Sequence, residues 1–244
     1  MAKGFFVTGS DTGVGKTIIT AALIRAANII GLRVCGMKPI ETGCKKTGTR
    51  TRSSEDGKEI LLPSDGMFLR EAAGMSDSLD LVTPLRFESP LAPLPASEME
   101  GRPVDLDKVR KSFAHLSERY DAVIAEGLGG LLAPIKRGYF VLDLARDLGL
   151  PLVVVSRPSL GTINHTLLTV NYAMREGLTV AGIILNYTTP PKNDLAEKSN
   201  PEVIQQLSPV PFIGIFPHLQ DLGNKTLENA VIENLDMGII KKYL

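Results

Sequence analysis

The stretch GSDTGVGKT, Gly9 to Thr17, joins an apolar run of strand length at residues 4–8 to a segment at residues 18–30 whose apolar side chains recur at helical spacing. In this order of strand, glycine loop and helix, backbone N–H groups and the positive end of the helix dipole can hold phosphate oxygens. Lys16 would neutralise those oxygens, and the Thr17 hydroxyl would ligate Mg²⁺. The usual pattern G-x-x-x-x-G-K-[ST] would begin at Ser10, so this loop is one residue longer, and a chance GKT in a loop is the alternative. The stretch predicts a nucleoside triphosphate site.

Length and composition fit one domain spanning residues 1–244, because 244 residues with 43% hydrophobic content can form one large core. Lys plus Arg equals Asp plus Glu, at 27 each, so no net field favours nucleic acid or an anionic membrane as a partner. Cys35 and Cys44 lie outside any metal or redox spacing and are expected to be free thiols. With no leader-like N-terminus and no apolar run near the ~18 residues of a membrane span, we expect a cytoplasmic protein.

Apolar runs of strand length alternate with helix-like segments along the rest of the chain. Strands that are apolar throughout are buried on both faces, which predicts an α/β fold with a parallel sheet, a three-layer αβα arrangement of the P-loop NTPase type. Such sheets bind ligands beyond the carboxyl ends of their strands, so the site should combine the glycine loop with Lys38, Glu126, Ser156, Asn186 and Pro217. The expected strands are 32–37, 122–125, 152–155, 180–185 and 212–216, and the expected later helices are 106–119, 140–148, 162–175 and 201–207.

Two stretches interrupt this alternation. The residues from Thr42 to Pro63 are polar and have no clear period, which predicts a mobile surface loop, and Ser64 with Asp65 would serve as the N-cap of the helix that follows. Five prolines lie between residues 84 and 103, which predicts an extended excursion over the surface in place of a helix or an inner strand.

Several candidate residues have both a functional and an ordinary interpretation. Glu126 ends an apolar strand before a glycine-rich loop, where nucleotide-transferring sites place a metal-binding carboxylate; a surface glutamate is the alternative. Asp65 and Asp56 are rival metal ligands, and either could instead be a helix cap or a solvated charge. Lys38 would be useful at a strand end if an anion meets it, but a surface lysine is as common there. His165, near a helix start, is more often structural than a base.

The motifs taken together resemble those of one known family. GSDTGVGKT is followed by KPIETG at residues 38–43, SDG at 64–66, EGLGG at 126–130, LGTINHTLLT at 160–169, ILNYTTPP at 184–191 and GIFPHL at 214–219. Their order and spacing are similar to those of dethiobiotin synthetase over nearly the whole chain. The resemblance implies an ATP-dependent ligase of biotin synthesis, which makes a cyclic urea from carbon dioxide and 7,8-diaminononanoate and releases ADP and phosphate.

The resemblance also implies a chemistry that needs no protein nucleophile. An amine adds to carbon dioxide to give a carbamate, the carbamate oxygen attacks the γ-phosphate, and the second amine closes the ring. Each step concentrates negative charge, so catalysis would rest on positioning and on electrostatic stabilisation by Lys16, Lys38 and Mg²⁺. Lys38 would be the catalytic lysine, and Thr17, Asp65 and Glu126 would surround Mg²⁺.

The same resemblance assigns the remaining binding residues. Thr42 stands where the family has a substrate-binding serine, a change that keeps the hydroxyl. Asn164, at a helix start, would bind the carboxylate of the diamine across the two-fold interface of a homodimer, and the amide of Asn186 would meet the adenine edge. The full set expected to bind the nucleotide and its metal is Gly13, Val14, Gly15, Lys16, Thr17, Ile18, Asp65, Glu126, Gly127, Leu128, Gly129, Asn186, Tyr187, Pro217, His218 and Leu219.

Besides Thr42, the chain departs from the family pattern in three places. The stretch from Thr47 to Pro63 is longer, so Asp65 is matched through its Ser-Asp context and Asp56 is its rival. Gly13 replaces an acidic residue often found in the loop. Asn224 stands where some members carry a ribose-binding glutamate.

Two other classes of protein use a similar phosphate loop. Cobyrinate synthases need a further glutamine-hydrolysing domain, for which 244 residues leave no room. A nucleotide-switch ATPase of the chromosome-partitioning kind carries a signature lysine early in the loop, where this chain has Asp11. ATP turnover that requires the diamine and bicarbonate would distinguish the ligase from such a switch.

Overall fold

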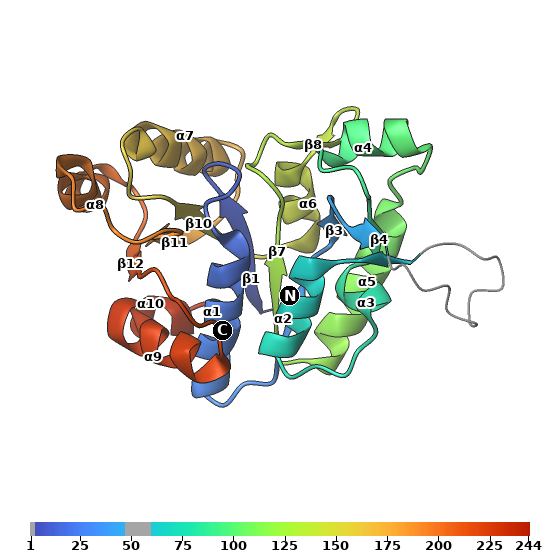
Figure 1. Cartoon of the computed structure of the whole chain (residues 1–244), viewed down its shortest axis with the longest axis horizontal. Helices are drawn as coiled ribbons and strands as arrows, with labels where there is room; N and C mark the ends of the chain where they lie inside the picture. The colour runs from blue at the N-terminus through green and yellow to red at the C-terminus, as the bar shows by residue number, and fades with distance from the viewer. Residues whose placement is uncertain (1–2, 47–59) are drawn as a thin grey trace.

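The structure is a computed structural model that describes residues 3–46 and 60–244. Within these residues six strands form one parallel sheet in the order β12-β11-β10-β1-β7-β2 (Figure 1). The predicted α/β fold is therefore confirmed. The strands are β1 (Gly4–Gly9), β2 (Val34–Met37), β7 (Ala122–Glu126), β10 (Leu152–Ser156), β11 (Val180–Asn186) and β12 (Phe212–Phe216).

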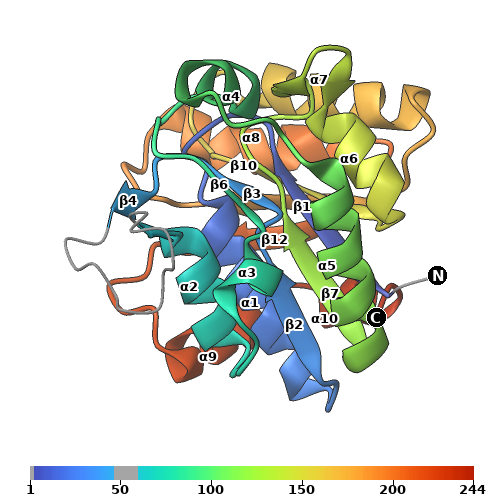
Figure 2. The same cartoon turned by 90° about the vertical axis from the view of Figure 1, so that its right-hand side faces the viewer.

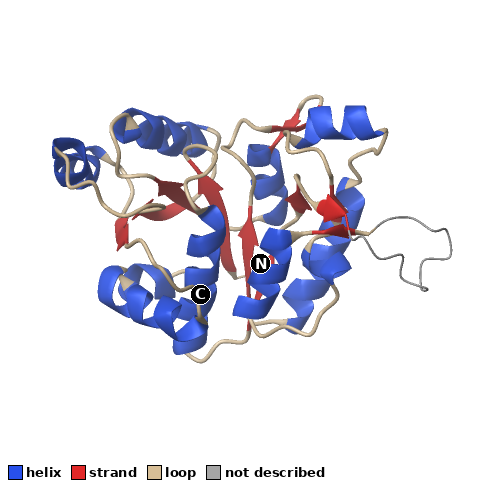
Figure 3. Ribbon diagram, in the orientation of Figure 1, coloured by secondary structure: helices blue, strands red, loops and turns tan. Residues whose placement is uncertain are grey.

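Helices cover both faces of this sheet, so that the strands lie between two helical layers (Figure 3). Successive side chains on β1 alternate between the layers: Phe5 and Val7 pack into one core and Phe6 into the other. Figure 2 shows α1 and α2 on one side of β1 and β7, and α5 and α6 on the other. The first layer holds α1 (Lys16–Ile29), α2 (Ser64–Ala72), α9 (Asn224–Asn234) and α10 (Met237–Lys241); the second holds α5 (Leu106–Arg119), α6 (Val141–Leu148), α7 (Thr162–Arg175) and α8 (Leu195–Leu207).

Short strand pairs lie outside the main sheet. β3 (Ile40–Glu41) pairs in parallel with β6 (Leu85–Arg86), and β8 (Pro134–Lys136) pairs with β9 (Tyr139–Phe140). β4 (Lys45–Lys46) pairs antiparallel with β5 (Leu61–Leu62), so the two ends of the stretch 42–63 are held together. The prediction of a mobile surface loop over residues 42–63 is therefore wrong for these paired ends. Residues 47–59, Asp56 among them, lie outside the described residues.

The proline-rich stretch was predicted to be extended, and this is wrong for its second half. α4 (Pro93–Glu100) is a helix that begins at Pro93, and Pro95 also lies in its first turn. The missing N–H groups of these prolines cost nothing there, because the first N–H groups of a helix have no partner within the helix. A further short helix, α3 (Leu79–Val82), precedes this stretch.

The structure also corrects the predicted start of α8 and the predicted cap of α2, and it adds two helices near the C-terminus. α8 begins six residues before Pro201 and accommodates that proline inside the helix. The helices α9 and α10, which follow Gly223, were not predicted. Ser64 and Asp65 are not the N-cap of α2, since they are its first two residues and the cap position is Pro63.

None of the helices in the described part of the chain is both long and apolar enough to span a bilayer.

Candidate active site

The glycine loop connects β1 to α1 as predicted, and glycine is required in it. Gly15, the residue before α1, has a φ of 84°, a left-handed conformation that favours glycine. A Cβ at this position would also lie 2.0 Å from Nδ2 of Asn186, so the loop and the end of β11 are in close contact. Nδ2 of Asn186 donates a hydrogen bond to the Val14 carbonyl at 2.9 Å. Asn186 therefore supports the loop directly, a contact that the expected role at the adenine edge did not include.

A cavity of about 340 Å³ opens at this loop. Its walls come from the glycine loop, the residues after β2, the start of α2 and the loop after β7. Thr12, Ile40 and Glu41 also line it and were not predicted. The predicted residues that line it are Gly13, Gly15, Lys16, Thr17, Lys38, Thr42, Asp65, Glu126, Leu128 and Gly129.

A lysine and two carboxylates meet on the floor of the cavity. Nζ of Lys38 lies 2.6 Å from Oε1 of Glu126 and 2.9 Å from Oδ2 of Asp65. The same Glu126 oxygen accepts a hydrogen bond from the Thr17 hydroxyl at 2.9 Å, and Nζ of Lys38 also donates to the Gly127 carbonyl at 3.3 Å. These groups come from four separate segments, so the fold brings together residues that are up to 109 positions apart.

Burial makes the charges of this cluster depend on one another. The side chains of Lys38 and Glu126 are 5% and 1% exposed. Burial alone would lower the pKa of Lys38, but the Glu126 and Asp65 carboxylates reverse this and hold that pKa above its ordinary value. Burial raises the pKa of Glu126, and the neighbouring Lys38 opposes that rise. The Lys38 ammonium is therefore a permanent positive charge at neutral pH.

The oxygens around Glu126 fit a magnesium ion. Oε2 of Glu126 is buried and has no hydrogen-bond partner among the described residues. A buried carboxylate oxygen without a donor is costly unless a cation meets it. No group of three His, Cys, Asp or Glu side chains forms a metal cluster in the described part of the chain, so a cation here would depend on Glu126, Asp65 and the Thr17 hydroxyl. Mg²⁺ accepts such a small set of hard oxygens, because it keeps several waters and binds substrate phosphates.

Lys16 has a different electrostatic environment from Lys38. Its Nζ donates to the Asp11 carbonyl at 3.2 Å within the glycine loop. Burial, and then the nearby Lys38 charge, lowers the pKa of Lys16 to about 8. An anion bound at the loop would favour the charged form of Lys16 and raise its pKa.

We expect nucleotide binding to take up a proton above about pH 8. In the free protein Lys16, with a pKa of about 8, is mostly neutral at pH 9, and bound phosphates raise that pKa so that the lysine becomes protonated. Below about pH 7 Lys16 is already charged and contributes no uptake. Calorimetric titrations of ADP in buffers of different ionisation enthalpy measure the proton count at each pH. Absence of uptake at pH 9 would mean that Lys16 is charged before the nucleotide arrives.

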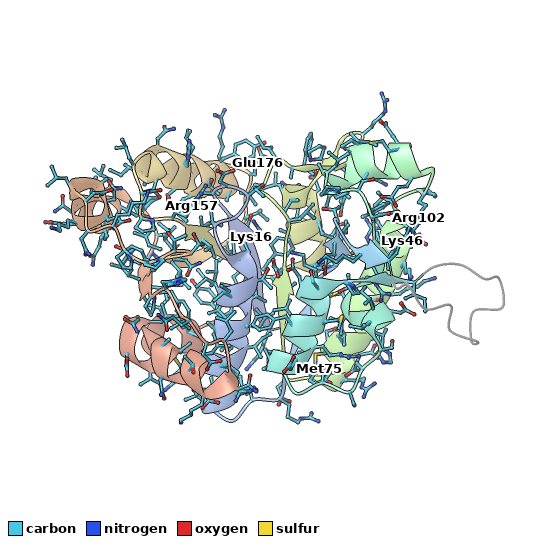
Figure 4. The ribbon with its side chains drawn as sticks, in the orientation of Figure 1. Lys16, Lys46, Met75, Arg102, Arg157 and Glu176 are labelled. Atoms are coloured by element: carbon cyan, nitrogen blue, oxygen red, sulfur yellow. The ribbon has the colours of Figure 1, made fainter. Side chains whose placement is uncertain are left out.

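The loop after β10 also contacts the glycine loop; β10 lies on the opposite side of β1 from β7 and β2. Nη2 of Arg157 lies 3.1 Å from Oδ2 of Asp11, and Figure 4 shows Arg157 and Lys16 near each other at the start of α1. Nδ2 of Asn200, on α8, donates to the Pro158 carbonyl at 2.7 Å. Sequence reasoning missed Arg157 and Asn200, since these contacts join residues 146 and 42 positions apart and leave no local pattern.

The remaining predicted residues lie outside the cavity walls. Val14 is buried in the loop, Ile18 is in the first turn of α1, and Gly127 supplies the carbonyl that Lys38 contacts. The backbone N–H of Tyr187 donates to the Phe216 carbonyl at 3.0 Å, so the segment of Pro217, His218 and Leu219 begins beside the end of β11.

Asn164 and Ser156, both predicted to belong to the site, do not line the cavity. Asn164 and His165 are exposed in the first turn of α7 and are not among the described residues that line the cavity. Ser156, at the end of β10, is buried and accepts a hydrogen bond from the Thr166 hydroxyl at 2.7 Å, so it joins β10 to α7. The predicted substrate-binding residue Asn164 is therefore not brought into the cavity wall of its own chain.

The sequence of this chain is similar to a family model and to several named proteins. Residues 3–226 match the family model described as an AAA domain. The chain is 47% identical to the ATP-dependent dethiobiotin synthetase of Thermodesulfovibrio yellowstonii, over 97% of this chain and 98% of that protein. It is 36% identical to the enzyme of the same name from Bacillus subtilis (strain 168), over 98% of this chain and 97% of that protein.

Solved structures agree on the fold. A ParA family ATPase from Chlorobium tepidum matches with a TM-score of 0.51 at 15% identity, over 98% of this chain and 97% of that chain. The MinC:MinD cell division complex of Aquifex aeolicus matches with a TM-score of 0.52 at 16% identity, over 99% and 95%. At 15% and 16% identity the likeness concerns the fold alone. The two sequence relatives are 47% and 36% identical over nearly their whole length, which shows a family. The chain belongs to the dethiobiotin synthetase family.

Proposed function

We propose that this protein catalyses the ATP-dependent carboxylation and ring closure of 7,8-diaminononanoate, which gives the cyclic urea dethiobiotin, ADP and phosphate. The observation that carries this proposal is the cluster of Lys16, Lys38, Thr17, Asp65 and Glu126 around one cavity at the glycine loop. The cluster lies in a chain that shares 47% of its residues with a protein named for this activity. One domain, residues 1–244, would carry the whole reaction.

The cluster suits a reaction in which negative charge accumulates. An amine of the substrate adds to carbon dioxide, loses a proton to solvent and forms a carbamate. A carbamate oxygen attacks the γ-phosphorus of ATP, the bond to ADP breaks, and a carbamic–phosphoric anhydride results. The second amine attacks the carbonyl carbon and loses a proton to solvent, the bond from that carbon to the phosphate oxygen breaks, the ring closes, and phosphate leaves. No side chain forms a covalent bond, so the protein contributes position and charge.

Each residue of the cluster has a defined task in this scheme. Lys16 would bind the β- and γ-phosphates from the loop. Lys38 would hold its proton on Nζ throughout and stabilise the charge where the carbamate meets the phosphate. Mg²⁺, held by Thr17, Asp65 and Glu126, would neutralise charge on the phosphate oxygens. The Thr42 hydroxyl, in the cavity wall, would bind the diamine, and the residues from Asn186 to Tyr187 and from Pro217 to Leu219 would contact adenine.

A coupled assay for ADP release tests this function. The protein is incubated with Mg²⁺ and ATP, with 7,8-diaminononanoate and bicarbonate each present or withheld, and dethiobiotin is identified by mass spectrometry. We expect ADP release and product only when both are present. Slow ATP hydrolysis that neither compound changes would instead favour a nucleotide switch of the partitioning type, whose fold this chain shares.

We also propose that the active protein is a homodimer in which Asn164 acts in the partner's site. Its support is the exposed position of Asn164 in the first turn of α7, where free N–H groups and the helix dipole suit a carboxylate. Asn164 is also not among the described residues that line the cavity of its own chain. Lys38 and Asn164 of one site would then belong to different chains. The two unpaired cysteines, both buried, agree with a cytoplasmic location.

Mixing two inactive variants should restore activity if this arrangement holds. In a hybrid dimer of a Lys38→Ala chain and an Asn164→Ala chain, one site carries both lesions and the other carries neither. Random mixing makes half of the dimers hybrids, so about a quarter of all sites should regain activity. The two variants are refolded together and assayed at saturating substrate. Activity no higher than the parents' mean, with subunit exchange confirmed by differently tagged chains, would assign both residues to the same chain's site.

A further inference from the structure

Glu41 is a buried carboxylate in the cavity wall that the proposed mechanism does not use. It ends β3, three residues after Lys38, and is 3% exposed. Its Oε1 accepts hydrogen bonds from the Asp65 N–H at 3.0 Å and from the Ser64 hydroxyl at 3.2 Å. Its Oε2 accepts from the Gly66 N–H at 3.0 Å. Both oxygens are therefore occupied by the first three residues of α2.

These bonds supply a cap that α2 does not have locally. The first N–H groups of a helix need an acceptor, and the residue in the cap position, Pro63, makes no side-chain cap bond. A carboxylate at this end also meets the positive end of the helix dipole. Glu41 satisfies both needs from another element, so the start of α2 is fixed relative to β3.

The first turn of α2 is held on its other side by close packing. A Cβ on Gly66 would lie 1.9 Å from the Thr83 hydroxyl oxygen, so the helix approaches this segment as closely as a glycine permits. The turn is thus confined between Glu41 and Thr83. Asp65 lies in that turn, and its Oδ2 is 2.9 Å from Nζ of Lys38.

We propose that Glu41 is a positioning residue, whose cap on the first turn of α2 sets the position of Asp65 beside Lys38 and Glu126. The inference rests on the proposed function, since it concerns the cation site assigned to Asp65. Glu41 and Lys38 belong to one short segment, whereas Asp65 follows the long stretch 42–63. Because the cap joins Glu41 directly to the first turn of α2, the conformation of residues 42–63 need not set the distance between Lys38 and Asp65.

A direct proton-transfer role for Glu41 is the rival interpretation. Burial raises the pKa of Glu41, and the N–H groups of Gly66 and Asp65 oppose that rise. A buried carboxylate near a substrate can act as a base. The three donors on its oxygens favour positioning instead, because all of them come from the first turn of α2 and direct both oxygens toward that helix.

The test compares Glu41→Gln, Glu41→Ala and, as a matched control, Glu71→Gln. Glu71 is an exposed residue of the same helix, far from the cap. Glutamine offers one carbonyl oxygen and turns an NH₂ group toward a donor, so it loses part of the cap, and alanine loses all of it. The first measurement is hydrogen exchange at the amides of residues 65 and 66, which should become faster in the order control, Gln, Ala.

Two further measurements distinguish positioning from a merely structural role. The affinity for Mn²⁺ as a probe of the cation site, measured by electron paramagnetic resonance with ADP bound, should fall by about 10- to 100-fold. The kcat should fall by a similar factor at every pH, with little change in the KM for ATP. Neither value should change in Glu71→Gln.

Each outcome decides the question. Faster exchange with unchanged Mn²⁺ affinity in Glu41→Gln would mean that the cap exists but does not position Asp65, which overturns the proposal. Unchanged exchange overturns it as well, and a shifted pH profile in place of a uniform loss would assign Glu41 to proton transfer. If the unaltered protein shows no diamine-dependent turnover, the proposed function fails, while the exchange and Mn²⁺ measurements still judge the role of Glu41.

Discussion

Lys38→Ala is expected to lower kcat by about 10²- to 10³-fold while it leaves the Kd for ATP nearly unchanged. Nζ of Lys38 is 2.6 Å from Glu126 and 2.9 Å from Asp65, on the floor of the cavity and separate from the Lys16 contact in the glycine loop. Its charge would therefore act mainly where carbamate and phosphate meet, and an interaction made only in the transition state affects turnover more than binding. Steady-state kinetics and calorimetric ATP titration measure the two quantities.

Stability has to be followed in the same experiment. Without Lys38, the Glu126 carboxylate, 1% exposed, loses its cationic partner, which is strongly destabilising for a buried charge. The Tm is therefore measured, and turnover is assayed well below it. Lys108→Ala, on the exposed face of α5, is the control and should alter neither quantity. Equal losses of turnover and ATP affinity in Lys38→Ala would reassign Lys38 to nucleotide binding.

Asp65→Asn should lower turnover by about 10²-fold or more and raise the Mg²⁺ concentration needed for half-maximal rate. Asp65 lies in the first turn of α2, where Glu41 and Thr83 hold the backbone, and a ligand on a fixed element is better placed than one in a loop. The amide keeps the size of the side chain but removes the charge that would meet the cation. Initial rates over a series of Mg²⁺ concentrations measure both effects.

Asp56→Asn is the matched control for this change. Asp56 was the rival metal ligand in the sequence, and it lies outside the described residues. We expect its substitution to leave the Mg²⁺ requirement unaltered. Loss of activity in Asp56→Asn with activity retained in Asp65→Asn would show that the family motif had been matched to the wrong aspartate.

The sequence alone predicted the sheet and most of the cavity, for physical reasons that particular residues illustrate. Runs such as Leu152–Ser156 are apolar at every position, which requires burial on both faces and hence a parallel sheet. Strand ends in such a sheet lie along one edge, so Lys38 and Glu126 could be expected to meet although 88 positions separate them.

Polar contacts away from the ends of the main-sheet strands could not be predicted in this way. Glu41 caps a helix that begins 23 residues later, and its sequence context contains no capping box. The absence of a suitable residue at Pro63 is the signal that could have suggested a remote cap. The number of prolines alone also hides the helix α4, because Pro93 and Pro95 lie in its first turn, where proline favours a helix.

The pairing of β4 with β5 at the two ends of the stretch 42–63 affects how many residues the chain can carry between them. Lys45 pairs with Leu62 and Lys46 with Leu61, and the Glu41 carboxylate binds Ser64 just beyond this pair. A loop whose ends are tied together becomes less favourable only slowly as residues are added, by about 0.6 kcal/mol for each doubling of its length. Residues gained or lost between positions 47 and 59 therefore need not disturb the catalytic groups. The same position is the natural place to insert a peptide tag or a spectroscopic label into a working enzyme.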